Sequence, residues 1–128
     1  MIPNIEELLA EENLTFTLKS GTFDVELIAA AIAGIGYPYR DELNPSCFAI
    51  FSAPKWRDDC RARRLADPSS TFPYVLLVAD KPHSVRVYPV SSQEDLRVLS
   101  VQFLEWMLSH YTCRIENEFG TDMTAPAE

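Results

Sequence analysis

Hydrophobic and polar residues alternate along three short stretches of the chain, and each of these stretches predicts a β-strand. Between Leu14 and Leu18 every second residue is apolar and threonine fills the positions between, which is the period of a strand buried on one face. Residues 85–89 and 113–119 alternate in a similar way. Residues 47–51 and 74–79 are apolar runs, which are typical of strands covered on both faces.

Four other stretches carry apolar residues at the three- and four-residue spacing of a helix buried on one side. They cover residues 4–12, 22–33, 55–66 and 93–111. Polar residues suited to capping a helix precede three of them: Asn4, Ser52, and Ser91 in a capping box with Glu94. We expect Gly34 and Gly36 to end the second helix.

The predicted elements follow the order α-β-α-β-α-β-β-α-β. Helices and strands that interleave in this way favour an α+β (mixed α/β) fold, with a single mixed sheet of four to five strands packed by three to four helices. Residues 80–84 are turn formers between two strands, so at least one strand pair is antiparallel. We expect one globular domain over residues 1–120 and a flexible acidic tail over residues 121–128.

The connection from residue 36 to residue 46 is longer than most links between neighbouring elements. It carries two tyrosines and three charged residues: Tyr37, Tyr39, Arg40, Asp41 and Glu42. Tyrosine and arginine are enriched at binding hot spots, and a long loop on a rigid domain is suited to recognition. We predict that these residues contact a partner; the alternative is that one or both tyrosines fold back onto the core.

Composition excludes several classes of protein for this 128-residue chain. Hydrophobic residues make up 47% of it, which is ordinary for a folded domain and argues against disorder. No apolar run approaches the ~20 residues of a membrane-spanning helix. With 19 acidic and 11 basic side chains the net charge is −8, whereas a phosphate-backbone binder needs clustered Lys and Arg. We therefore expect neither membrane insertion nor direct nucleic-acid binding.

The charge is unevenly distributed along the chain. Residues 1–30 carry a net charge of −5 and residues 105–128 one of −4, whereas residues 55–64 carry +3. If the first helix lies near the last strand, the two acidic ends form one face that suits a basic partner or mimics a nucleic acid. The alternative is that the acidity only maintains solubility.

The helix predicted at residues 55–66 has two distinct sides. Three arginines form a ridge at helical spacing: Arg57, Arg61 and Arg64. Guanidinium groups in this arrangement could hold a phosphate or a carboxylate, or they could pair with the protein's own carboxylates on a solvated face. Three other side chains are expected to face the core: Trp56, Cys60 and Leu65.

The three cysteines, Cys47, Cys60 and Cys113, are far apart in the sequence and odd in number. They predict free thiols in a cytoplasmic protein rather than a disulfide framework or a zinc site. The N-terminus is acidic where an export signal would be positively charged, which agrees with a cytoplasmic location.

Candidate catalytic and metal-binding residues are few. A cysteine enzyme would pair Cys60 with His83 or His110 as the base, but no spacing requires this arrangement. The adjacent pair Asp58 and Asp59 would diverge by ~100° on a helix and so cannot easily share an ion. We expect no metal and no cofactor.

Together these features favour a non-enzymatic, acidic protein-binding module. We expect an inhibitor or immunity-type protein that binds and neutralises a toxin, nuclease or defence complex, as a monomer or homodimer, through a partner with a basic surface. Two alternatives remain open. One is a regulatory domain that binds a small anion or nucleotide on the Arg57, Arg61 and Arg64 ridge; the other is a small enzyme with a cysteine nucleophile.

Overall fold

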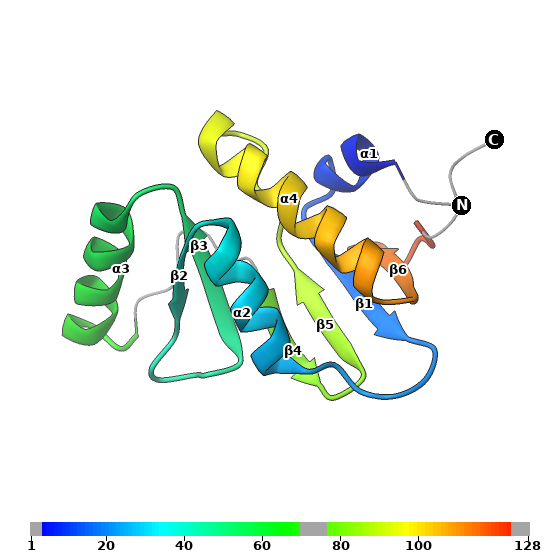
Figure 1. Ribbon diagram of the computed structural model, residues 1–128, viewed down its shortest axis with the longest axis horizontal. Helices are drawn as coiled ribbons and strands as arrows, with labels where there is room; N and C mark the ends of the chain where they lie inside the picture. Colours follow the sequence, from blue (N-terminus) through cyan, green and yellow to red (C-terminus); the bar gives the residue numbers. More distant parts are fainter. Residues whose placement is uncertain (1–3, 70–76, 124–128) are drawn as a thin grey trace.

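The computed structural model describes residues 4–69 and 77–123, which form a mixed α+β fold with four helices. In chain order its elements are α1 (Ile5–Leu9), β1 (Leu14–Leu18), α2 (Val25–Ile35), β2 (Tyr37–Arg40), β3 (Cys47–Phe51), α3 (Pro54–Ala66), β4 (Leu77–Lys81), β5 (Ser84–Val87), α4 (Glu94–His110) and β6 (Cys113–Asn117). Figure 1 shows α2 and α4 lying across the strands, with α1 beside α4 and α3 beside β2 and β3. No helix in the described ranges is both long and apolar enough to cross a membrane.

Five of the strands form two antiparallel groups. One group has three strands in the order β5-β1-β6, and the other is the β2-β3 hairpin. The remaining strand, β4, lies between the groups: it pairs with β5 around a bulge and with β3 through two residue pairs, which gives the order β2-β3-β4-β5-β1-β6. The predicted mixed sheet of four to five strands is therefore wrong, because each pairing among the described residues is antiparallel and a three-stranded and a two-stranded group are joined through β4.

The hairpin differs from the prediction because β2 lies within the residues expected to form a long loop. Four residues are too few to show a hydrophobic period, and Pro38 argues against a strand inside a sheet. In the structure β2 is an edge strand, where a missing N–H is tolerated. Tyr37 lies opposite Phe51 in the hairpin.

β3 is covered on both faces, as its apolar sequence predicts. Phe48 and Ile50 belong to the larger hydrophobic cluster, here called the main core, which lies beneath α2 and α4. Ala49 and Phe51 face the other way. With Tyr39 and Cys60 they form a smaller set of buried residues beneath α3, here called the α3 cluster: Tyr39, Ala49, Phe51 and Cys60. The two clusters therefore share β3 as their common wall.

The main core is formed largely by α4 and the three-stranded group. Alternation in β1 is confirmed, because Leu14 and Phe16 are buried. On α4 the helical spacing predicts the buried side well: Leu96, Leu99, Phe103 and Met107 face the core, whereas His110 is exposed. Full burial of one such side chain contributes about 2–3 kcal/mol, so this cluster dominates the stability.

Helix capping follows the sequence at α1 but not at α3 or α4. Asn4 caps α1 by accepting a hydrogen bond from the Glu6 amide at 2.9 Å. The residues at the starts of α3 and α4 are Ala53 and Gln93, and neither side chain caps its helix. Ser52 instead donates its hydroxyl to Asp95 at 2.5 Å. Ser52 and Ser91, which the sequence predicts as the caps of these helices, are therefore not their N-cap residues.

The boundaries of α2 also differ from the prediction. This helix begins after Asp24, whose carboxylate accepts hydrogen bonds from the amides of Glu26 and Leu27. It runs through Gly34 and ends at Gly36, so only the second glycine ends it. Beyond this point the chain passes directly into β2.

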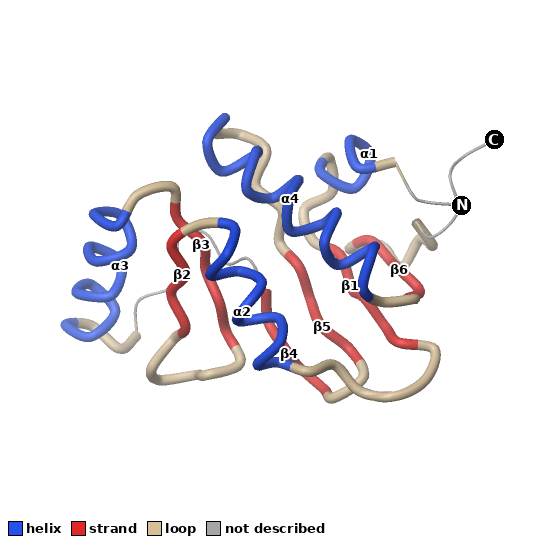
Figure 2. Tube along the Cα trace, in the orientation of Figure 1, coloured by secondary structure: helices blue, strands red, loops and turns tan. Residues whose placement is uncertain are grey.

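The end of the chain returns along β6. Phe119, expected in the last strand, lies beyond β6 and is 83% exposed. Gly120, at φ +79°, makes the turn, and the Met123 amide then donates to the Ile115 carbonyl at 2.6 Å. Residues 121–123 of the predicted tail are therefore bonded to β6, as Figure 2 shows in tan beside the strand; residues 124–128 lie outside the described residues.

The predicted start of the fourth strand, residues 74–76, also lies outside the described residues.

Candidate protein-binding surface

The structure brings together the two sets of residues that the sequence proposed separately for binding. α3 packs on β2 and β3, so the arginines of α3 lie against the strand and loop that carry the tyrosines. We call this region the α3 face, defined as β2, the β2–β3 loop (residues 41–46) and α3. Its members are held by a series of ion pairs that differ greatly in burial.

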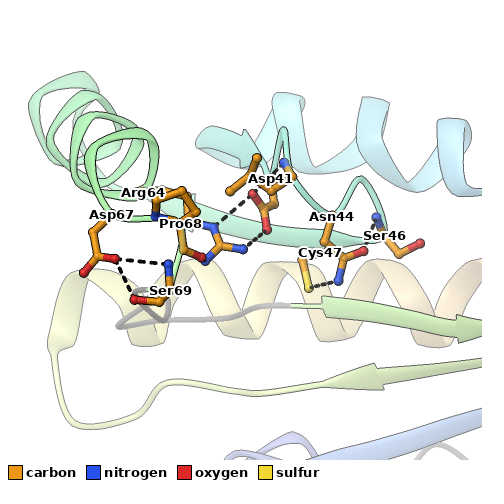
Figure 3. A network of polar contacts seen from close by, with 9 residues as sticks. Asp41, Asn44, Ser46, Cys47, Arg64, Asp67, Pro68 and Ser69 are labelled. Carbon is orange, nitrogen blue, oxygen red and sulfur yellow. Dashed lines mark hydrogen bonds and ion pairs between the residues drawn. The ribbon is translucent and has the colours of Figure 1, made fainter.

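The innermost pair joins Arg64 of α3 to Asp41 of the loop. The Asp41 side chain is only 3% exposed, and its Oδ2 lies 3.1 Å from Arg64 Nη2 while Oδ1 accepts from Nε at 3.3 Å. Figure 3 shows the guanidinium between Asp41 and Pro68, whose carbonyl accepts from Nη1 at 2.6 Å. Oδ1 also accepts from the Leu43 amide. This two-point pairing fixes the loop to the end of α3 and leaves neither partner on the open surface.

The β2–β3 loop also has hydrogen bonds of its own. In Figure 3 the Asn44 side chain lies between Ser46, whose amide it accepts from at 3.4 Å, and the Cys47 sulfur at 3.5 Å. On the far side of Arg64, the Asp67 carboxylate accepts from the amide and hydroxyl of Ser69. These bonds to Ser69 hold the pKa of Asp67 below its usual range. The loop and the end of α3 are thus built of short, local polar contacts.

The other two arginines of the ridge are paired on the surface. Arg61 Nε donates to Glu42 at 2.5 Å, a hydrogen bond that raises the pKa of the guanidinium. Arg57 donates to Asp58 at 3.2 Å and lies 5.8 Å from the centre of the Tyr37 ring. Each arginine of the predicted ridge therefore faces one of the protein's own carboxylates, which is the arrangement expected of a solvated face rather than an empty anion site.

The residues of β2 divide into buried and exposed ones. Tyr39 is 4% exposed and faces the α3 cluster, whereas Tyr37 is 42% exposed. Arg40 links β2 to α2 by donating to Glu26 at 2.7 Å, and it lies over the Phe48 ring. One tyrosine thus folds onto the core and one stays on the surface. Of the eight predicted residues, the exposed ones are Tyr37, Arg40, Glu42 and Arg61.

A cavity of about 450 Å³ lies next to this surface, between α3, the end of β3 and the start of α4. Phe51, Trp56 and Leu96 supply its apolar lining, and its charged lining residues are Asp59, Arg63 and Asp95. Trp56 and Leu65, expected to point inward, are 54% and 46% exposed, so that prediction is wrong for both. The narrow β2-β3 hairpin offers α3 little to cover, and Cys60 is its one buried residue.

Sequence reasoning missed this cavity because its residues come from three separated segments. Trp56 was the available signal: a tryptophan surrounded by charged residues on a strongly polar helix has few apolar neighbours to bury it. Asp95 and Ser52 approach each other only after β3 and α4 have packed together. No pattern of spacing along the chain indicates that contact.

Cys60 lines the cavity but is not arranged as a nucleophile. Burial raises the pKa of its thiol, and the nearby Arg63 and Arg64 offset this only in part. No hydrogen bond joins it to His83 or His110 in the part of the chain that the structure describes. Nor does any group of three potential metal ligands occur among the residues that the structure describes. The geometry gives no support to the cysteine-enzyme alternative.

Acidic residues that follow α1 and β6 come together at the side of the molecule opposite the α3 face. Glu11 and Glu12, which follow α1, and Glu118, which follows β6, line one open hollow of about 430 Å³. Backbone N–H groups, first that of Glu118 itself, hold the pKa of the Glu118 carboxyl below its usual range. The end of α1 therefore lies near the end of β6, and three carboxylates gather there; the wider acidic face stays a prediction.

Comparison with known proteins adds no identification. No protein family, curated protein or solved structure matches this chain.

Proposed function

We propose that the protein is a non-enzymatic, acidic protein-binding module of the inhibitor or immunity type, which acts in the cytoplasm on a partner with a basic surface. The α3 face is the surface that contacts this partner. Toxins, nucleases and defence complexes are the targets we expect, because such proteins carry basic surfaces that an acidic partner can cover.

The observation that carries the proposal is the pair of open aromatic residues beside the cavity. Trp56 and Tyr37 are about half exposed, and Arg57 lies over the tyrosine ring. Tryptophan, tyrosine and arginine are the residues most enriched among those that dominate binding energy. Exposed rings around a hollow are suited to a partner's side chain, because they bury much area with little loss of conformational freedom.

The charge distribution supports a basic partner. Carboxylates pair with the arginine ridge, but the α3 face still has six basic and four acidic side chains, so the excess of negative charge lies on the rest of the chain. Carboxylates such as Glu11, Glu12 and Glu118 then add a long-range attraction that steers a positive partner. The three free cysteines suit the reducing cytoplasm.

The proposal is tested by capture from a lysate of the source cell on the immobilised protein. We expect a basic protein to be retained at ~50 mM salt and largely released at ~500 mM, because salt screens the attraction. Trp56→Ala should reduce capture at least fivefold, whereas Phe119→Ala should not, since Phe119 is an aromatic residue even more exposed than Trp56 but lies beyond the opposite edge strand. Capture that is independent of salt, or equal for the two variants, would contradict the proposal.

A further inference from the structure

The side chains that line the cavity beside α3 indicate a particular kind of occupant. Phe51 and Leu96 line it from β3 and α4, and Trp56 lines it from α3. Phe51 and Leu96 are buried, whereas half of Trp56 is open to solvent. A side chain entering the cavity would therefore meet two fixed apolar walls and one aromatic ring at the entrance.

Two carboxylates from different elements face the same space. Asp95, at the start of α4, accepts the Ser52 hydroxyl at 2.5 Å, and this bond holds the pKa of Asp95 below its usual range. Asp59, on α3, has no hydrogen-bond or ion-pair partner within residues 4–69 and 77–123. Of the lining residues that the structure describes, Arg63 is the one cation, so this described lining carries a formal net charge of −1.

The tryptophan adds a preference for a cation. Lys55 Nζ lies 5.3 Å from the centre of the Trp56 ring, so the ring is already reached by one positive charge. Lysine is flexible and strongly hydrated, whereas a guanidinium is planar, weakly hydrated and stacks on aromatic faces. A guanidinium is therefore the better ligand for an indole ring that stands beside two carboxylates.

We propose that this cavity receives one arginine side chain of the basic partner, an inference that rests on the proposed function and names the chemistry of its contact. The guanidinium stacks on Trp56 and donates to Asp59 and Asp95, and its aliphatic stem lies against Phe51 and Leu96. Its planar donors match two carboxylates from separate elements better than a lysine's single charge. The charge of Arg63 repels the guanidinium, so the site favours a guanidinium that is placed against Asp59 and Asp95.

The alternative occupant is an anion, an aromatic or aliphatic carboxylate that would bind Arg63. The start of α4 favours an anion through the helix dipole, but Glu94 and Asp95 already occupy its first turn. The two possibilities predict opposite effects of removing Arg63. Its loss strengthens the binding of a cation and weakens the binding of an anion, so one substitution decides between them.

The experiment is an NMR titration of the whole protein with N-acetyl-arginine amide, which carries one guanidinium and no carboxylate. The signals to follow are the indole N–H of Trp56 and the backbone amides of α3 and the first turn of α4. Trp106, stacked on His110 at the other end of α4, is the internal control because it lies far along the helix. N-acetyl-norleucine amide and benzoate serve as the neutral and anionic probes.

We expect N-acetyl-arginine amide to shift the Trp56 indole and not the Trp106 indole. Asp59→Asn should weaken binding about three- to fivefold, as expected for an exposed charge pair. Asp58→Asn is the matched control. It removes the same charge from the neighbouring residue, whose side chain does not line the cavity, and it should change the affinity by less than about twofold. Arg63→Gln should strengthen binding.

Three results would overturn the inference: no shift of the Trp56 indole, equal losses for Asp59→Asn and Asp58→Asn, or benzoate binding that Arg63→Gln abolishes. These outcomes are separable from the failure of the proposed function. If the partner is still captured in a salt- and Trp56-dependent way while N-acetyl-arginine amide does not bind, the module stands and only the arginine anchor is wrong. If both fail, the proposed function fails as well.

Discussion

The main core and the α3 cluster represent two different ways of holding a helix on strands. Beneath α2 and α4, Phe16, Phe103, Met107 and many aliphatic residues form a continuous buried cluster. Beneath α3 the cluster consists of Tyr39, Ala49, Phe51 and Cys60, and ion pairs to the β2–β3 loop accompany it. The first region is stabilised by apolar burial and the second by polar contacts around a small centre.

This difference matters for function because a region with little core can leave aromatic residues on its surface. α3 buries Cys60 and leaves Trp56 half exposed. Regions with few buried apolar contacts also open more readily than the main core. The part of the molecule that we propose for binding is therefore the part that is held least firmly.

The largest effect is expected from truncating the main core. Phe103→Ala removes a fully buried ring and should lower the free energy of unfolding by about 3–5 kcal/mol. Urea unfolding followed by far-UV circular dichroism measures this loss. A loss below about 1 kcal/mol would show that the stability does not reside in this cluster.

The next effect tests the polar support of α3. Asp41→Asn leaves the Arg64 charge without its buried partner and should lower the stability by about 2–3 kcal/mol, because Arg64 is itself mostly buried. Amide hydrogen exchange should accelerate in α3 and the β2–β3 loop more than in α4. Uniform acceleration across the chain would contradict the separation of the two regions.

A smaller effect compares the buried thiols of the two regions at high pH. Burial raises the pKa of Cys113 in the main core from 9.0 to about 11, so the folded state keeps its proton after the unfolded state has lost it. The resulting stability is present below pH 9 and is lost as the pH rises towards about 11. Cys113→Ala should flatten this fall by about 1–2 kcal/mol in urea titrations at a series of pH values.

Cys60→Ala should remove a smaller part of the same alkaline fall, because the arginines near Cys60 lower the pKa of its thiol and oppose the effect of burial. An alkaline fall that is larger for Cys60 than for Cys113 would reverse the comparison. A protein whose stability does not change over this range would contradict both assignments.

The smallest effect concerns the surface pair of the α3 face. Arg61→Gln removes an exposed ion pair with Glu42 and should leave the urea midpoint unchanged within error. Arg64→Gln, on the same ridge, should destabilise the protein clearly because its partner Asp41 is buried. Equal effects of the two substitutions would show that burial does not separate these pairs.

The sequence predicts most of the main core because its elements are long or strictly periodic. β1 and β3 have the predicted bounds, and the apolar spacing of α4 identifies most of its buried side. β2 is missed because a four-residue edge strand containing Pro38 shows no period. The separate two-stranded group is missed for the same reason, since its hairpin needs β2 as the partner of β3.

The candidate site is predictable only in part. The tyrosine loop and the arginine ridge are visible in the sequence, but their contact depends on α3 packing over β2. Asp41 and Arg64 look like surface charges in the sequence, and the structure buries them as a pair. Trp56 looks like a core residue, and the small area of the hairpin leaves it open. In each case the tertiary contact, and not the local pattern, determines burial.

The most direct test of the binding surface is amide hydrogen exchange of the protein with and without its captured partner. If the α3 face contacts the partner, the amides of β2, α3 and the first turn of α4 gain protection from exchange, while those of β6 and the residues after it do not. Protection confined to the residues around Glu11 and Glu118, with none at α3, would contradict it and assign recognition to the acidic end instead.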